Sequence, residues 1–156
     1  MKFLIHQKII VETIRINFML LPKKVKFRKW QTGRTDMTKV TPDTRGITVA
    51  FGSYALKATK GGRIRSNQIE SARKVTSRTI GKTGRMWIRI FPDRPFTAKP
   101  AEVGMGKGKG DPQGYCLDIR PGRVIFEVDG VPEAVAKEAL RKAGTKLPVT
   151  TRVVAR

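Results

Sequence analysis

Two stretches of the chain repeat their apolar residues at the spacing of a helix. In residues 67–80 the repeating positions are Ile69, Ala72, Val75, Thr76 and Ile80. In residues 132–144 they are Val135, Ala136, Ala139, Leu140 and Ala143. Side chains three and four positions apart share one face of a helix, and an apolar face is buried against a neighbouring element. The pattern predicts two amphipathic helices.

Turn and capping residues set the expected limits of these helices. Asn67 stands three residues before Glu70, which is the spacing of a capping box at a helix start. Gly81 follows the first helix and ends it. Pro132 is a favoured first-turn residue for the second helix, and Gly144 ends that one.

Short runs of β-branched and aromatic residues between turn residues predict strands. The expected strands are 46–52, 55–59, 85–91, 115–120, 123–129 and 147–154. Pro121-Gly122 separates two of them and predicts that 115–120 and 123–129 pair as a hairpin. Pro148 lies within the last run and predicts an edge strand.

Strands followed by a helix, twice in succession, predict an α+β fold. We expect a two-layer sandwich with two helices on one face of a mostly antiparallel sheet. A single domain of residues 46–156 should follow a basic arm of residues 19–45. Four prolines and five glycines between Pro92 and Gly114 predict a long loop over 92–114.

Residues 1–18 are apolar but interrupted by charged residues, so they lack the continuous centre of a secretory signal. They are either an amphipathic leader or the product of a misassigned start codon. We favour the second, with Met19 as the first residue.

The charge narrows the class of partner. The 156 residues include 33 Lys and Arg against 12 Asp and Glu, a formal net charge of +21. This balance excludes an ordinary metabolic enzyme as the default and favours RNA, DNA or an anionic membrane as partner. The sequence contains no run of 18 apolar residues and therefore predicts no membrane-spanning helix. One Cys and one His cannot form a disulfide or a zinc site, so we expect no metal and no cofactor.

The cations fall in an arm and on the predicted domain. Five of the seven residues in 23–29 are basic: Lys23, Lys24, Lys26, Arg28 and Lys29. Further candidates for phosphate contacts are Arg34, Lys57, Arg63, Arg65, Arg73, Lys74 and Arg78. Counterion release would make such binding steeply dependent on salt. Trp30 and Tyr54 are candidates for base stacking, whereas Trp87 is expected in the core.

Four glycines alternate with other residues in 104–110. Alternating glycine allows close backbone approach, and lysines offer charge to phosphate. The segment fails the test for a nucleotide-binding P-loop, because its spacing of Gly and Lys is wrong. It is either a flexible hairpin tip or a finger that inserts between segments of nucleic acid.

The sequence offers little support for catalysis. Cys116 lies in a predicted strand without a neighbouring histidine. Glu127 and Asp129 share one face of a strand beside a turn, where they are expected at the surface or as partners of arginine. We therefore predict that the protein has no catalytic residues and is not an enzyme.

Seven segments occur in the order found in a known family. They are Met19-Leu-Leu-Pro-Lys-Lys-Val-Lys-Phe-Arg-Lys29, Phe51-Gly-Ser-Tyr-Ala-Leu-Lys-Ala58, Gln68-Ile-Glu-Ser-Ala-Arg73, Trp87-Ile-Arg-Ile-Phe-Pro-Asp93, Lys99-Pro100, Met105-Gly-Lys-Gly-Lys-Gly110 and Asp129-Gly-Val-Pro-Glu133. The chain from Met19 to about Val153 resembles the bacterial-type large-subunit ribosomal protein L-sixteen family.

The resemblance implies an α+β sandwich that binds large-subunit (23S-type) rRNA, neighbours other ribosomal proteins and acts late in subunit assembly. It places the glycine-lysine loop near A-site tRNA, with P-site tRNA as a second candidate, close to the peptidyl-transferase centre. The tRNA-proximal residues would be Met105, Gly106, Lys107, Gly108 and Lys109. It also implies a cytoplasmic bacterial ribosome, with an organellar ribosome as the alternative. No membrane, small-molecule substrate or second copy of the chain is expected as a partner.

The chain departs from the family at Gly104, where many members have an arginine that some bacteria hydroxylate. That modification and its charge are absent here. Two rival functions remain: a free-standing nucleic-acid-binding module, and an RNA hydrolase that uses Glu127 or Asp129.

Overall fold

The computed structural model describes residues 20–33, 35–37 and 39–156. The predicted leader or misassigned start, residues 1–18, therefore lies outside the described residues. The elements are β1 Tyr54–Ala58, β2 Gly62–Arg65, α2 Ser66–Ile80, β3 Arg85–Ile88, β4 Arg94–Ala98, β5 Asp111–Ile119, β6 Val124–Asp129, α3 Glu133–Gly144 and β7 Thr151–Ala155.

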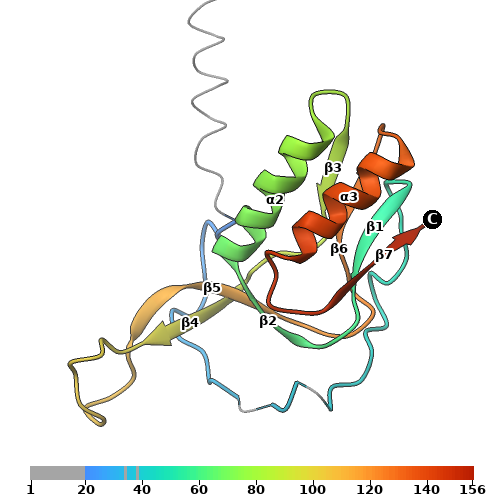
Figure 1. Ribbon diagram of the computed structural model, residues 1–156. Coiled ribbons are helices and arrows are strands. Elements are labelled where there is room, and N and C mark those ends of the chain that lie inside the picture. The colour runs from blue at the N-terminus through green and yellow to red at the C-terminus, as the bar shows by residue number, and fades with distance from the viewer. Residues whose placement is uncertain (1–19, 34, 38) are drawn as a thin grey trace, which may run out of the picture.

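The strands form two antiparallel sheets, in the orders β3-β6-β1-β7 and β2-β5-β4. Helices α2 and α3 lie side by side over one face of the four-stranded sheet (Figure 1). This arrangement confirms the predicted α+β class with two helices on an antiparallel sheet. Strand β7 is at an edge, as expected, but it begins at Thr151 rather than at residue 147, so Pro148 lies before the strand and not within it.

The main core lies between the helices and the four-stranded sheet. Leu56, Phe126 and Val128 contribute from the strands, and Ile69 and Leu140 from the helices. All five are almost completely buried. Apolar residues at helical spacing therefore meet alternate residues of β1 and β6, which is the layer packing that the sequence predicted.

The start of α2 differs from the prediction. The Arg65 N–H donates to the side chain of Gln68 at 2.9 Å, so the cap lies two residues earlier than the expected pair of Asn67 and Glu70. Glu70 is held by Arg73 at 2.7 Å, which keeps its carboxylate from reaching back to the helix start.

The predicted hairpin of 115–120 and 123–129 is wrong. Strand β5 pairs with β2 and β4, whereas β6 pairs with β1 and β3 in the other sheet. The intervening turn is held from outside: the Gly122 N–H donates to the Ala58 carbonyl at 2.7 Å, and the Pro121 carbonyl accepts from the Asp43 N–H at 2.8 Å. These contacts direct the chain from one sheet to the other.

The predicted loop over 92–114 contains two strand segments. Strand β4 occupies Arg94–Ala98 and pairs with the start of β5, so the loop is limited to residues 99–110. Pro95 is compatible with β4 because β4 is an edge strand. The β4–β5 pair, called the ribbon below, projects from the body and carries the glycine-lysine loop at its end (Figure 1).

Residues 46–52 do not form the predicted strand. The N–H groups of Ala50, Phe51 and Gly52 instead donate to the carboxylate of Glu127 at 2.6 to 3.2 Å. Glu127 is completely buried, so the expectation of a surface position is wrong. Its expected pairing with an arginine is confirmed, because Arg89 binds it.

The four-stranded sheet is covered on both faces. Pairing places Ala55, Glu127 and Trp87 in one row, opposite to the row of Leu56 and Phe126 that faces the helices. Residues 50–52 bind Glu127 from this second side. Trp87 is half-buried there and stacks on Phe51, outside the main core in which it was expected.

Candidate nucleic-acid interface

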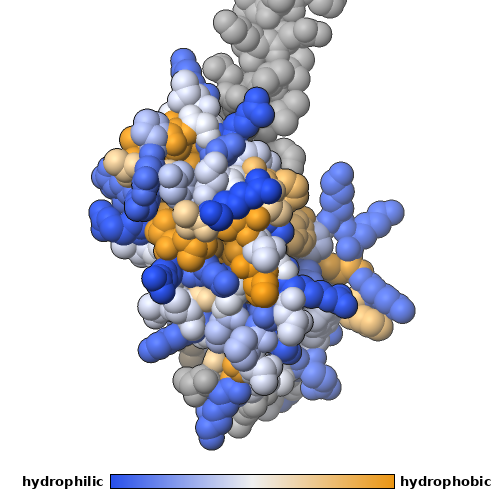
Figure 2. Space-filling view, turned by 90° about the vertical axis from the view of Figure 1, so that its right-hand side faces the viewer, coloured by the Kyte–Doolittle hydropathy of each residue, from blue (hydrophilic) through white to orange (hydrophobic). Residues whose placement is uncertain are grey.

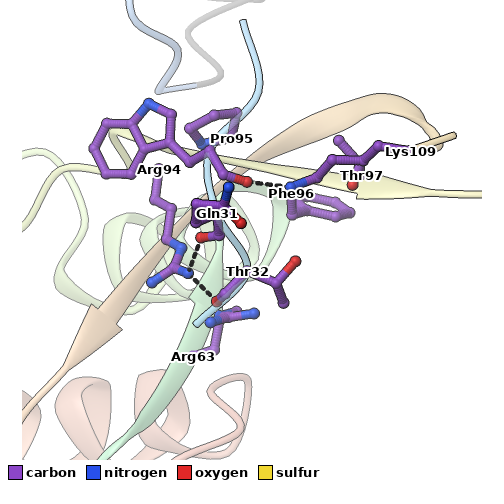
Figure 3. A pocket seen from close by; sticks show the side chains of 9 residues that line it. Gln31, Thr32, Arg63, Arg94, Pro95, Phe96, Thr97 and Lys109 are labelled. Carbon is purple, nitrogen blue, oxygen red and sulfur yellow. Dashed lines mark hydrogen bonds between the residues drawn. The ribbon is translucent and has the colours of Figure 1, made fainter. Parts of the chain in front are cut away.

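Arg94 fastens the basic arm to the ribbon. Its guanidinium donates to the Gln31 carbonyl at 3.0 Å and also donates to the Thr32 carbonyl (Figure 3). The same guanidinium pairs with Asp118 of β5. Carbonyl oxygens are acceptors whatever the side chain, so this contact holds the arm backbone and leaves its side chains unconstrained.

The arm also contacts the root of the glycine-lysine loop. Lys109 donates to the Trp30 carbonyl, as Figure 3 shows, and Lys29 donates to the Lys109 carbonyl at 3.1 Å. Lys29 lies 3.8 Å from the Asp111 carboxylate as well. The structure thus brings together two predicted groups of site residues, the arm and the loop, at Lys29 and Lys109.

Asp118 lies between two cations on the three-stranded sheet. Arg63 of β2 donates to it at 2.6 Å, and this hydrogen bond raises the pKa of the Arg63 guanidinium despite partial burial. Arg65, on the same strand, lies 4.8 Å from the centre of the Phe96 ring. Arg63 therefore lines the same hollow as arm residues Trp30 to Thr32, whereas the contact given for Arg65 is with Phe96 of the ribbon.

The hollow between the arm and the ribbon holds about 60 Å³ and is lined by Trp30, Arg63, Arg94 and Lys109 among others. Small-molecule sites usually enclose on the order of 300–1,000 Å³. This hollow is a joint between two parts of the chain and has little room for a ligand.

The other arm cations point to solvent. Lys23, Lys24, Lys26 and Arg28 are exposed, whereas Lys29 is half-buried by its contacts with the loop root. Lys26 lies 5.4 Å from the centre of the Phe27 ring. Arg34 lies outside the described residues. Four of the five predicted arm residues are thus presented together while the fifth attaches the arm.

Helix α2 carries a second group of basic residues, and its C-terminal end lies far from the glycine-lysine loop (Figure 1). Arg73, Ser77, Arg78 and Lys82 line an open hollow of about 760 Å³ at the end of this helix. Arg73 is bound to Glu70, and this hydrogen bond lowers the pKa of the Glu70 carboxyl despite partial burial. Lys74 and Arg78 are exposed on the same helix.

Lys57 belongs to neither basic surface. It lies on β1, half-buried and close to the turn at Gly122. The structure therefore does not bring Lys57 together with the other predicted residues.

The tip of the loop is open on all sides. Met105 is fully exposed, and a Cβ built at Gly104, Gly106 or Gly108 meets nothing within 4 Å. Gly106 and Gly108 have φ values of +99° and +90°, which L side chains rarely adopt. The two glycines are thus required by the backbone conformation, while Gly104 is not.

Three residues that hold the arm or the loop were missed from the sequence. Arg94 is one of them; Arg123 binds the Asp43 carboxylate at 3.4 Å and the Arg45 carbonyl at 2.8 Å, and Lys99 donates to the Gly106 carbonyl. Nothing in their spacing distinguishes them from other basic residues. Their role depends on contacts between distant parts of the chain.

Hydrophobic side chains remain on the surface among these cations. Phe27, Trp30, Phe51 and Phe91 are each more than 40% exposed. Figure 2 shows hydrophobic residues gathered in the middle of one face, with hydrophilic side chains projecting around them. Such a mixed surface is typical of contacts with RNA, which offers both phosphates and base faces.

Three further observations concern the thiol, metal binding and membrane-spanning helices. Cys116 is buried in β5, and burial raises the pKa of its thiol, which keeps the thiol protonated and unreactive. Among the described residues, no group of His, Cys, Asp and Glu is placed to hold a metal ion. In the same part of the chain, no helix has the length and apolar character needed to cross a membrane.

We expect Arg94→Ala to release the arm from the ribbon, because the guanidinium supplies both carbonyl contacts and the pair with Asp118. Limited trypsin digestion should then cut at Lys23 to Arg28 several-fold faster than in the unaltered protein. Lys146→Ala, which removes an exposed cation elsewhere, is the control. Equal cutting rates in both variants would show that Arg94 does not hold the arm.

These features define a class: a strongly basic α+β protein with exposed cations and aromatic rings on its surface. The family model described as Ribosomal protein L16p/L10e matches residues 22–154. The chain is 54% identical to the large ribosomal subunit protein uL16 of Acidovorax sp. (strain JS42) over 138 residues, which are 88% of this chain and 97% of that relative. The proteins of the same name from Verminephrobacter eiseniae and Polaromonas sp. are 52% and 51% identical over the same shares of both chains.

The chain therefore belongs to the ribosomal protein L16p/L10e family and is a structural protein of the large ribosomal subunit.

Proposed function

We propose that this protein binds large-subunit rRNA through its arm and α2, and that its glycine-lysine loop reaches toward tRNA at the entry side of the peptidyl-transferase region. The observation that carries the proposal is the attachment of the arm. Arg94 and Lys109 hold arm carbonyl groups, while four arm cations stay exposed. An arm fixed by its backbone presents those cations at a defined place, which suits crowded rRNA phosphates.

The two basic surfaces support a partner that contacts the protein from more than one side. The arm and ribbon form one surface and the hollow at the end of α2 forms the other. The sites proposed for rRNA are the arm cations with Arg63 and Arg65, and Arg73, Lys74 and Arg78 on α2. Lys57 and Arg34 stay expectations from the sequence.

The loop residues Met105, Gly106, Lys107, Gly108 and Lys109 are proposed as the part nearest to tRNA. Met105 and Lys107 are exposed at the end of the ribbon, the most distant point from the body (Figure 1). A role in late subunit assembly and contacts with neighbouring ribosomal proteins belong to the same proposal.

The relatives support a ribosomal location and a structural role for this protein. They are bacterial proteins named for the large ribosomal subunit, which indicates a cytoplasmic ribosome, and their name is that of a structural protein rather than an enzyme. The buried position of Glu127 argues further against a hydrolase that uses this carboxylate, because water and substrate cannot reach it.

The direct test is ultraviolet cross-linking of the protein in its own cells, followed by sequencing of the attached RNA. We expect cross-links concentrated in large-subunit rRNA around the tRNA entry cleft. Cross-links spread over messenger RNA would contradict the proposal and favour a free-standing nucleic-acid-binding protein.

Replacing Gly106 and Gly108 together with Val should impair peptide synthesis more than subunit assembly. Both positions have positive φ, so Val forces the loop into a different conformation, while the open surroundings leave the folded body untouched. Subunit profiles and the rate of dipeptide formation on purified ribosomes measure the two effects.

Gly104→Val is the matched control for the loop variant. It adds the same side chain in equally open space, but Gly104 has no positive φ. We expect close to normal peptide synthesis from it. Failed assembly with normal peptide synthesis in the double variant would contradict the proposed place of the loop.

A further inference from the structure

Phe51 is an exposed aromatic residue that the protein holds rigidly. It is 58% exposed, yet its N–H donates to the buried Glu127 carboxylate at 2.6 Å, between the similar contacts of Ala50 and Gly52. Leaving an aromatic ring in water forgoes the free energy of burying it. The segment is thus fixed so that this ring faces outward.

Gly52 allows the segment to lie against the sheet. A Cβ at this position would be 2.7 Å from the Val128 carbonyl oxygen, a backbone atom that cannot move aside. The Ser53 N–H donates to the same oxygen at 3.2 Å. The position of Phe51 therefore rests on hydrogen bonds from the N–H groups of residues 50–53 to two residues of β6, the Glu127 side chain and the Val128 carbonyl.

Trp87 of β3 and Arg89, the residue after β3, support the Phe51 ring. The Arg89 guanidinium carbon lies 4.8 Å from the ring centre, and the Trp87 ring lies 6.2 Å away with its plane inclined by 23°. Arg89 is also paired with Glu127. The charge of Arg89 is therefore balanced by a carboxylate of the protein. The guanidinium contributes a flat cationic surface beside two rings.

We propose that Phe51, supported by Trp87 and Arg89, is a stacking platform for an unpaired base of large-subunit rRNA. This inference rests on the proposed function and adds to it a contact that involves no phosphate. Single-stranded RNA is recognised by stacking bases on aromatic rings and guanidinium planes. The net charge of +21 attracts a polyanion, which favours RNA as the partner of this face.

The experiment measures the affinity of the full-length protein for large-subunit rRNA over a range of salt concentrations. Phe51→Ala and Phe51→Leu should each weaken binding by about 5- to 150-fold at fixed salt, which is the range for one base stacked on a side chain. The slope of log affinity against log salt should not change, because every phosphate contact remains. Phe51→Tyr keeps a ring and should bind normally.

The leucine variant separates stacking from packing. If the ring serves only to shield the Arg89–Glu127 pair from water, leucine covers the pair nearly as well and restores binding. Restored binding by Phe51→Leu, or a changed salt slope in either variant, would overturn the platform. Melting curves identify a variant that fails to fold.

A second measurement uses the unaltered protein, so its result does not depend on whether a variant folds. Ultraviolet cross-linking of the ribosome followed by mass spectrometry of the peptides should find a nucleotide attached to Phe51 or Trp87. Cross-links to rRNA at the arm with none at these two rings would overturn the platform and leave the proposed function standing. Absence of rRNA binding by the unaltered protein would overturn both.

Discussion

Replacing Glu127 with Ala is expected to lower the free energy of unfolding by about 3–5 kcal/mol, the usual cost of removing one partner of a buried ion pair. Three backbone N–H groups and the Arg89 guanidinium lose their acceptor, and segment 50–52 loses its attachment to the sheet. Glu127→Gln keeps the shape and one acceptor oxygen, so its effect should be smaller. Urea unfolding followed by circular dichroism measures both.

Glu138→Ala is the matched control. Glu138 is an exposed glutamate paired with Lys142 one helical turn away, and such pairs contribute little. Equal destabilisation by Glu127→Ala and Glu138→Ala would contradict the role assigned to the buried carboxylate.

The same group gives the stability a dependence on pH. Burial raises the pKa of Glu127, but the N–H groups of Gly52, Phe51 and Ala50, together with Arg89, outweigh it and hold the pKa below its ordinary value. A lowered folded-state pKa stabilises the protein above the unfolded value of about 4.3, and this stabilisation disappears as pH falls through the folded value. Glu127→Gln should therefore show a shallower loss of stability in acid than the unaltered protein.

The second large effect concerns salt. If the protein contacts 6–10 phosphates, its affinity for rRNA should fall about 10³- to 10⁵-fold between 50 and 200 mM salt. Replacing Lys24, Lys26 and Arg28 with Ala should lower affinity and reduce the slope of log affinity against log salt by about one unit for each phosphate that is no longer neutralised, about three in all. All three side chains are exposed on the attached arm.

The control is a variant with Arg141, Lys146 and Arg152 replaced by Ala. Its net charge equals that of the variant with the three arm substitutions. These residues are exposed at the end of α3 and beyond. A smaller change of slope is expected from it. An equal change would show that rRNA responds to overall charge rather than to the arm.

The sequence predicted the parts of the fold that depend on local pattern. Both helices were expected because their apolar residues repeat at helical spacing, and their observed limits differ by at most one residue from residues 67–80 and 132–144. Each of these features is decided by neighbours in the chain.

The errors concern pairing between distant segments. Pro121-Gly122 has the residues of a hairpin turn, but β1 and the arm hold that turn and divide its flanking strands between two sheets. The strand expected at 46–52 has suitable residues, yet Glu127, 75 to 77 positions later, takes its N–H groups. No local pattern contains this information.

The candidate site also contains residues that local pattern predicted and residues whose role depends on distant contacts. The arm and loop lysines were predicted from their density and from the family resemblance, and the structure presents most of them at the surface. Their attachment through Arg94 could not be predicted, because a single arginine between two prolines resembles any other basic residue. Stacking of Phe51 on Trp87 likewise required the register of β3 with β6.

The arm is made long before the residues that hold it. Arg94 follows Thr32 by 62 positions, and Lys109 follows Trp30 by 79. During synthesis the polycationic segment therefore leaves the exit tunnel while its docking surface has not yet been translated. In that interval neither Arg94 nor Lys109 is present to hold the carbonyl groups of the arm. Completion of the ribbon ends this interval, so the order of translation sets when the newborn protein is ready for its proper partner.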